Sequence, residues 1–145
     1  MSLAITIPGE PVAQGRPRAF RTKAGFIRTF DPEKSRSWKG VAQVHYTEAL
    51  RQAGLASPAF DGAVEVQVFA VFTCPKSQHR KREPLPRRRR TGRPDPDNIG
   101  KAVMDAANGV LFVDDSQVVR LVVEKWTGAQ GEAPHVLVTV RSIPE

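Results

Sequence analysis

The sequence predicts a single α+β domain in which a mixed β-sheet packs with two helices. Residues 2–7 and 63–72 alternate apolar and polar side chains with the two-residue period of strands. Two other segments repeat apolar side chains every three to four residues, as amphipathic helices do. A chain of 145 residues is long enough to bury one core, so we expect one unit over residues 1–145.

The first third of the chain predicts a strand, an irregular segment and a long helix. Residues 2–7 alternate like a strand, and residues 9–25 are rich in glycine and proline, which favours a loop or irregular hairpin. A short strand through residues 26–30 follows. Asp31 and Pro32 indicate a helix start, and Gly54 caps its end after Ala53. The helix face expected to point inward comprises Trp38, Val41, Ala42, His45 and Ala49.

The remaining elements are a strand over 63–72, a short helix after residue 95, and strands over 117–126 and 135–143. Residues 76–93 lie between the first of these strands and the helix. They hold nine Lys or Arg and show no periodicity. They therefore predict a mobile, solvated basic loop in the free protein.

Charge and composition narrow the functional classes. The net charge of +7, from 22 basic and 15 acidic residues, favours nucleic acid as the partner. The chain has no 18-residue apolar run and no signal-peptide pattern, so we expect a cytoplasmic protein without a membrane partner. Cys74 is the only cysteine and the three histidines are scattered, which excludes a cysteine-based zinc site and favours oxygen ligands for any metal.

An acidic cluster begins at RPDPDN, residues 93–98, directly after the basic segment. Asp97 or Asn98 is expected to cap the short helix. One helix face is apolar and should pack inward, namely Ile99, Ala102, Val103 and Ala106. At 100° per residue the opposite face carries Asp97, Lys101, Asp105 and Asn108.

These polar residues have a purely structural interpretation, in which Asp97 caps and Lys101 forms ion pairs worth about 0.2–0.5 kcal/mol each. A second acidic pair, Asp114 and Asp115, favours another interpretation. A turn after Gly109 would return the next strand beside the helix start and gather four carboxylates. Such a cluster is costly unless a cation neutralises it, and Mg²⁺ prefers carboxylate oxygens.

Two further considerations define the chemistry. A calcium EF-hand is excluded, although DPDNIG resembles its opening, because Ile99 and Ala106 occupy the fifth and twelfth positions, where ligands are required. Carboxylate-bound metal beside basic residues suits phosphodiester hydrolysis, since the metal acidifies water and neutralises phosphoryl charge. Lys101 is the candidate for stabilising charge in the transition state.

Residues 93–126, RPDPDNIGKAVMDAANGVLFVDDSQVVRLVVEKW, resemble the signature of the RusA family of Holliday junction resolvases. The family pattern is roughly [RK]PDxDNxxKAxxDAxxG, then DDxQV and a strand ending in Lys. The segment IPGEPVAQGRPRAFRTKAGFIRTF also resembles the amino-terminal GxPxxxxRPR region of members common in bacteria and their phages.

The resemblance implies a Mg²⁺-dependent homodimer that cuts four-way DNA junctions with paired, symmetric nicks. Mn²⁺ is a possible substitute, and no organic cofactor is expected. Asp95, Asp97 and Asp115 match the family's metal-binding carboxylates, and Lys101 matches its essential lysine. Asp105 and Asp114 match acidic positions of secondary rank. Which of Asp114 and Asp115 completes the site stays open.

The arginines supply the expected DNA contacts. They are Arg16 and Arg18 in the GRPR segment, Arg87, Arg88, Arg89 and Arg90 in the basic loop, and Arg93. Each phosphate neutralised would lower log K by about 0.9 per unit of log salt. The alternative for these arginines is a solvated surface. Two other functions also stay open: a nuclease for flaps or simple branches, and a DNA-binding module without catalysis.

Overall fold

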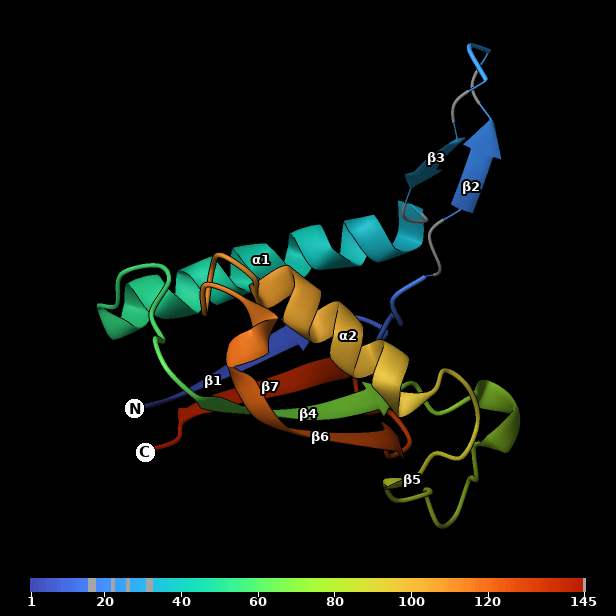
Figure 1. The fold of residues 1–145 in the computed structure, drawn as a ribbon. Coiled ribbons are helices and arrows are strands. Elements are labelled where there is room, and N and C mark those ends of the chain that lie inside the picture. The colour runs from blue at the N-terminus through green and yellow to red at the C-terminus, as the bar shows by residue number, and fades with distance from the viewer. Residues whose placement is uncertain (16–17, 22, 26, 31–32, 145) are drawn as a thin grey trace.

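The computed structural model describes residues 1–15, 18–21, 23–25, 27–30 and 33–144. Its elements in chain order are β1 (Ser2–Pro8), β2 (Arg18–Arg21), β3 (Ile27–Phe30), α1 (Glu33–Ala53), β4 (Val64–Phe72), η1 (Lys76–Gln78), β5 (Arg88–Arg89), α2 (Pro96–Ala107), η2 (Asp115–Gln117), β6 (Val118–Thr127) and β7 (His135–Ser142). The predicted α+β fold with a mixed sheet and two helices is confirmed (Figure 1).

The main sheet has five strands in the order β1-β7-β4-β6-β5. Neighbouring strands are antiparallel except β4 and β6, which run parallel. A parallel pair needs a long crossover, and here the crossover contains α2. The strands β2 and β3 form a separate antiparallel pair, which agrees with the hairpin alternative for this region.

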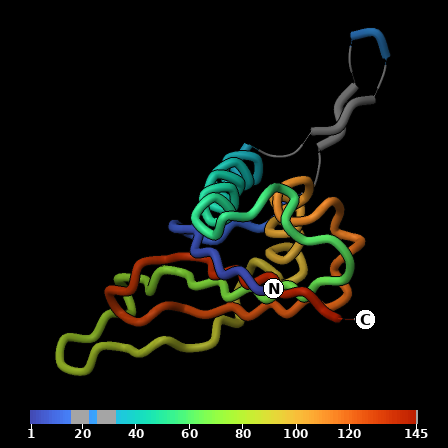
Figure 2. Tube along the Cα trace, turned by 90° about the vertical axis from the view of Figure 1, so that its left-hand side faces the viewer, coloured from blue at the N-terminus to red at the C-terminus, as the bar shows by residue number. Residues whose placement is uncertain are grey.

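Both helices lie on the same face of the main sheet (Figures 1 and 2). Alternate side chains of the two central strands fill the space beneath the helices. They are Val64, Val66 and Val68 of β4 and Val136, Val138 and Val140 of β7, none more than 1% exposed. Burying a valine stabilises the fold by about 1.5–3 kcal/mol relative to leaving it exposed, so this layer anchors everything above it.

The opposite face of the sheet contains a buried carboxylate. Glu65 of β4 is 2% exposed, and its two oxygens lie 3.0 Å from Arg120 Nε and 3.1 Å from Arg141 Nη2. Gln67 Nε2 also donates to Glu65, at 2.9 Å. Because burial of an unpaired charge is costly, these contacts explain how a glutamate is tolerated there and tie β4 to β6 and β7.

The inward face of α1 differs in part from the prediction. Trp38 and Ala42 are buried as expected, but Val41 is 45% exposed, and His45 and Ala49 are only half-buried. Tyr46 and Leu50 are buried in their place. The buried face therefore follows every fourth residue from Trp38, a choice that packing against the sheet and α2 decides and helix periodicity alone does not.

Tyr46 joins the two helices. Its hydroxyl donates to the carbonyl oxygen of Val103 on α2 at 3.1 Å, inside the core. Burial raises the pKa of Tyr46 far above its ordinary value, since the phenolate would lose its water. The predicted inward residues of α2 are confirmed, because Ile99, Ala102, Val103 and Ala106 are all buried.

Residues 76–93 are mostly irregular and exposed, as expected of a solvated loop, and they include two short regular elements that composition did not predict. The mobility expected in the free protein stays a prediction. The segment contains η1 and β5, and β5 pairs with the end of β6. Gln130, in the turn between β6 and β7, accepts the backbone N–H groups of Arg80 and Leu85 at 2.9 and 3.2 Å. These partners come from distant parts of the chain, so composition could not reveal them.

No helix in the described ranges is long and apolar enough to cross a membrane.

Candidate metal and nucleic-acid site

The first turn of α2 presents two carboxylates. The helix begins at Pro96 and its capping residue is Asp95, so the prediction of Asp97 or Asn98 as cap is wrong. The helix starts earlier because Pro96 suits the first helical position. The side chain of Asp95 makes no capping hydrogen bond, and only its carbonyl accepts from Ile99 N–H, at 3.3 Å. Asp95 and Asp97 therefore both expose their carboxylates at the positive end of the helix dipole.

Lys125 positions the loop that carries these carboxylates. Its ammonium donates to the carbonyl oxygens of Gly92 and Pro94, at 2.8 and 2.9 Å. Sequence reasoning missed this role. The sequence does contain an indication of it. The alternate positions of β6 that face α2 are Leu121, Val123 and then Lys125. A cation at an inward position of a strand needs a polar partner, and here the partner is the loop before Asp95.

The amino-terminal basic segment leaves from beside the same turn. Gln14 N–H donates to the carbonyl oxygen of Asn98 at 3.0 Å, and Gly15 N–H donates to Ser35 Oγ at 2.8 Å. Arg16 follows directly but lies outside the described residues. Arg18 belongs to β2, and its side chain lies outside the described part of the structure.

A cleft of about 570 Å³ opens between this segment and the loop before α2. Its lining includes Lys34, Arg93 and Pro94, and Glu10 is the acidic residue among them. The Arg93 side chain is exposed and its carbonyl accepts two hydrogen bonds from Arg90, at 3.1 and 2.7 Å. The cleft is therefore lined by cations a short distance along the chain from Asp95.

Lys101 and Asp105 continue the polar face of α2. Lys101 is exposed and Asp105 is half-buried, one and two turns beyond Asp97. The purely structural interpretation required ion pairs between Lys101 and its acidic neighbours. Among the described residues, no salt bridge joins Asp97 to Lys101. Together with the absent cap at Asp97, this removes the two structural roles considered for that carboxylate.

Asp114 and Asp115 differ in their hydrogen bonds. The carboxylate of Asp114 caps η2 by accepting Ser116 N–H at 3.1 Å. The hydrogen bond from the Ser116 side chain, and then that from its backbone, hold the pKa of Asp114 below its usual value. Gln117 completes the cap by accepting Asp114 N–H at 3.2 Å. Asp115 is the first residue of η2 and has no such capping role. Asp115 is thus the better ligand candidate of the two.

The two acidic pairs lie at opposite ends of α2. A β-carbon at Gly100 would lie 3.0 Å from Leu121 and 3.1 Å from Val123, while Lys125 reaches Pro94, so β6 runs back along α2 toward its start (Figure 1). The end of β6, not its beginning, therefore meets the first turn of α2. With a rise of ~1.5 Å per helical residue, Asp97 is roughly 15 Å from the end of α2, where η2 follows.

The expectation that four carboxylates gather within one chain is therefore wrong. In the portion of the chain that the structure describes, no three Asp, Glu, His or Cys residues lie close enough to hold one metal ion. As expected, the chain turns after α2 and β6 returns along that helix. Gly109 lies at the turn and has a positive φ of 77°, a backbone conformation that glycine adopts readily. The strand returns in the direction that separates Asp115 from Asp95.

The four consecutive arginines are held by intramolecular contacts. Arg89 and Arg90 stack their guanidinium groups on Trp126 and Phe72, 4.7 and 4.1 Å from the ring centroids. Arg88 donates to Gln78 Oε1. These stacked and hydrogen-bonded side chains lie at one edge of the sheet, which is called the arginine edge below.

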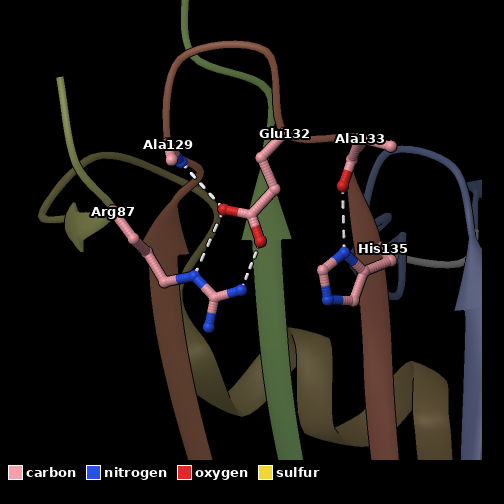
Figure 3. A network of polar contacts seen from close by, with 5 residues as sticks. All are labelled: Arg87, Ala129, Glu132, Ala133 and His135. Carbon is pink, nitrogen blue, oxygen red and sulfur yellow. Dashed lines mark hydrogen bonds and ion pairs between the residues drawn. The ribbon is translucent and has the colours of Figure 1, made fainter. Parts of the chain in front are cut away.

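Arg87 is the member of the run whose charge is neutralised. Its guanidinium donates twice to the carboxylate of Glu132, with Nε at 3.3 Å, and Ala129 N–H donates to the same carboxylate at 2.8 Å (Figure 3). The hydrogen bond from Arg87 and then that from Ala129 lower the pKa of Glu132, and the pairing raises the pKa of Arg87. The run therefore presents less positive charge than its composition indicates.

Glu132→Gln is expected to tighten DNA binding. The substitution keeps an acceptor for Ala129 but removes the charge opposite Arg87, which frees that guanidinium for phosphate. The slope of log K against log salt should steepen by up to about 0.9. Fluorescence anisotropy over a salt series measures it. Glu48→Gln is the matched control, since Glu48 pairs with Arg51 on the surface of α1. Equal slopes for the two variants would show that Arg87 is not a phosphate contact.

Comparison with known proteins assigns the chain. The family model described as endodeoxyribonuclease RusA matches residues 8–141, nearly the whole length. The chain belongs to the RusA family. Another relative is the uncharacterized protein YqaN of Bacillus subtilis (strain 168), which is 33% identical over 144 residues, covering 97% of this chain and 96% of YqaN. The first turn of α2, Lys101, η2 and the arginine edge all lie within the part matched by the RusA family.

Proposed function

We propose that this protein is a Mg²⁺-dependent, structure-selective endodeoxyribonuclease that resolves four-way DNA junctions by paired, symmetric nicks. Its membership of the RusA family supports a nuclease acting on DNA junctions. The observation that carries the proposal is the pair of exposed carboxylates, Asp95 and Asp97, which the helix does not use for capping. They stand beside a cleft lined by Lys34 and Arg93.

The donor set fits a hard divalent cation. Mg²⁺ is usually held by one or two carboxylates, with water and substrate phosphate filling its remaining positions. Asp95 and Asp97 would supply the carboxylates from one chain. When bound, the ion would polarise the scissile phosphate and acidify the attacking water. Mn²⁺ shares the preference for oxygen ligands and is expected to substitute.

The chain's own residues would bind and orient the DNA. Lys101, exposed one turn beyond Asp97, would stabilise the negative charge that builds on the phosphate in the transition state. Arg89, Arg90 and Arg93 would contact the backbone and position it without reading sequence. Lys125 acts through the loop carbonyls, so it is a positioning residue for Asp95.

A homodimer would explain how Asp115 takes part. Within one chain Asp115 lies at the far end of α2 from Asp95 and Asp97, so the three cannot share an ion there. A second copy related by a twofold axis would bring its own Asp115 to the first copy's carboxylates, and the reverse. Two such sites related by the same axis would suit two nicks at symmetric positions.

The proposal is tested by comparing substrates and metals. Purified protein is incubated with a mobile four-way junction, a flap and a matched linear duplex, each with Mg²⁺ or with EDTA. We expect paired nicks in the junction only, dependent on Mg²⁺ and supported by Mn²⁺. Equal cutting of flaps and junctions would favour the branch nuclease instead. Tight junction binding without nicks in either metal would favour the DNA-binding module.

A further inference from the structure

Gln117, the last residue of η2, uses every hydrogen-bonding position of its side chain. Its Oε1 accepts the backbone N–H groups of Val113 and Asp114, at 2.8 and 3.2 Å. Its Nε2 donates to the carbonyl oxygens of Phe60 and Gly62, at 3.1 and 2.9 Å. A primary amide has one oxygen with two lone pairs and one NH₂ group with two hydrogens, so all four positions are filled.

The four partners belong to two segments that are far apart in sequence. Two lie in residues 113–117, which are called the acidic turn below, and two lie in residues 60–62, just before β4. The core holds the second segment firmly. Phe60 is 1% exposed, its N–H donates to the carbonyl oxygen of Leu111 at 2.9 Å, and its backbone forms a parallel bridge with Phe112. Nε2 therefore bonds to a segment whose position is already fixed.

The acidic turn lies at the surface. Val113 and Asp114 are exposed and Asp115 is half-buried. Two hydrogen bonds of the turn are local, because Ser116 N–H donates to the Asp114 carboxylate and Gln117 N–H donates to the Asp114 carbonyl, both at 3.1 Å. These local bonds set the shape of a single 3₁₀ turn. The side chain of Gln117 ties that turn to the rest of the fold.

The arrangement of partners selects glutamine at position 117. Two N–H groups face Oε1 and two carbonyl oxygens face Nε2, so one orientation of the amide satisfies all four. Glutamate would place a carboxylate oxygen against the two carbonyls, where a donor is required. Methionine has a similar length but would leave all four backbone groups without this partner.

The position of Asp115 inside the tied turn distinguishes this arrangement from general support of the fold. The bond from Asp114 N–H to Gln117 Oε1 closes a small ring of chain, and Asp115 lies within it. Its backbone is thus held from both sides by one side chain. Residues that orient a metal ligand through hydrogen bonds commonly contribute 10–100-fold to metal affinity or activity.

We infer that Gln117 is a positioning residue for Asp115, which ties the acidic turn to the segment before β4 and so holds the Asp115 carboxylate in place for a divalent cation. The inference deepens the proposed function and rests on it for the role of Asp115 as a ligand. Gln117 touches neither the cation nor the DNA, since backbone groups occupy its amide. Lys125 holds the loop before Asp95 in the same way, through two carbonyl oxygens.

The first test compares Gln117→Met with Ser57→Ala. Ser57 Oγ donates to the carbonyl oxygen of Val110 at 2.8 Å, so Ser57 joins neighbouring parts of the chain without touching the acidic turn. In Gln117→Met the Mg²⁺ concentration for half-maximal junction nicking should rise about tenfold or more, with cutting recovered at high Mg²⁺. In Ser57→Ala it should not change. An unchanged Mg²⁺ requirement in Gln117→Met would overturn the inference and leave Gln117 a structural residue.

The second test requires no DNA cutting. Electron paramagnetic resonance measures Mn²⁺ binding, and hydrogen exchange measures the protection of the amides of Val113 and Asp114. In Gln117→Met both amides should exchange faster and Mn²⁺ should bind more weakly, whereas Ser57→Ala should match the wild type. Unchanged exchange and unchanged Mn²⁺ binding in Gln117→Met would contradict the inference.

Two further outcomes keep the inference separate from the proposed function. A wild-type protein that binds Mn²⁺ but never cuts a junction would sink the proposed function, and weaker Mn²⁺ binding by Gln117→Met would still support the inference. A wild type that binds no Mn²⁺ would overturn both. If circular dichroism shows that Gln117→Met does not fold, Gln117→Glu takes its place, since a carboxylate still accepts the two N–H groups of the acidic turn but cannot donate to the carbonyls before β4.

Discussion

Asp97→Asn is expected to abolish junction cutting while the junction is still bound. The asparagine keeps the shape and the exposed position in the first turn of α2 but removes a charged oxygen ligand for Mg²⁺. Loss of one such electrostatic contribution to a transition state commonly costs on the order of 10³-fold in rate. Single-turnover nicking of a synthetic junction measures the rate, and anisotropy in EDTA measures binding.

Binding by Asp97→Asn should be equal to or tighter than that of the wild type, because a negative charge near the phosphates is removed. Asp61→Asn is the matched control, since Asp61 is also exposed but lies in the turn before β4. Cutting by Asp97→Asn at the wild-type rate would show that Asp97 does not hold the ion. Loss of both binding and cutting, with the fold intact, would instead make Asp97 a residue that shapes the DNA-binding surface.

A mixture of two inactive variants is expected to recover cutting if Asp115 acts across the dimer. Asp97→Asn and Asp115→Asn should each be inactive alone. In a mixed dimer, one site would receive the intact Asp95 and Asp97 of one copy and the intact Asp115 of the other. Random exchange in an equal mixture makes about half the dimers mixed, each with one of two sites intact, so about a quarter of the sites should be active.

The product of this mixture distinguishes the two arrangements further. A mixed dimer has one working site, so junctions should accumulate with a single nick, where the wild type makes paired nicks. The control is a mixture of Asp97→Asn with Lys101→Met. Both changes fall on α2, so a mixed dimer has no complete site, whether Asp115 acts within one chain or across the dimer. Cutting by this control would show that Lys101 also acts across the dimer. If all three carboxylates acted within one chain, the first mixture would remain inactive.

Local patterns predicted the secondary structure around the site well. Strand formation at β4, β6 and β7 and the apolar face of α2 depend on neighbouring residues, and each matched its expectation. The inward face of α1 was less accurate, because Tyr46 is amphipathic and its burial depends on the Val103 carbonyl across the core. A polar tip that finds a distant partner cannot be foreseen from helical spacing.

The same distinction holds within the candidate site. Asp95, Asp97 and Lys101 share one turn or two of a single helix, so local geometry alone puts them together. Lys125 and the arginine edge depend on partners contributed by other strands and turns, such as Pro94, Trp126 and Glu132. Those partners are brought near by the strand order β4-β6-β5, which no local pattern specifies.

By itself, the sequence determined that a rigid Asp-Pro-Asp turn starts an amphipathic helix beside a basic segment, because capping, proline geometry and helical period act over a few residues. Only the tertiary structure decided that β6 runs back along α2 with its far end at that turn. Strand direction follows from the parallel crossover between β4 and β6, a long-range feature of packing. That direction separates Asp115 from Asp95 and brings Lys125 to the loop before α2.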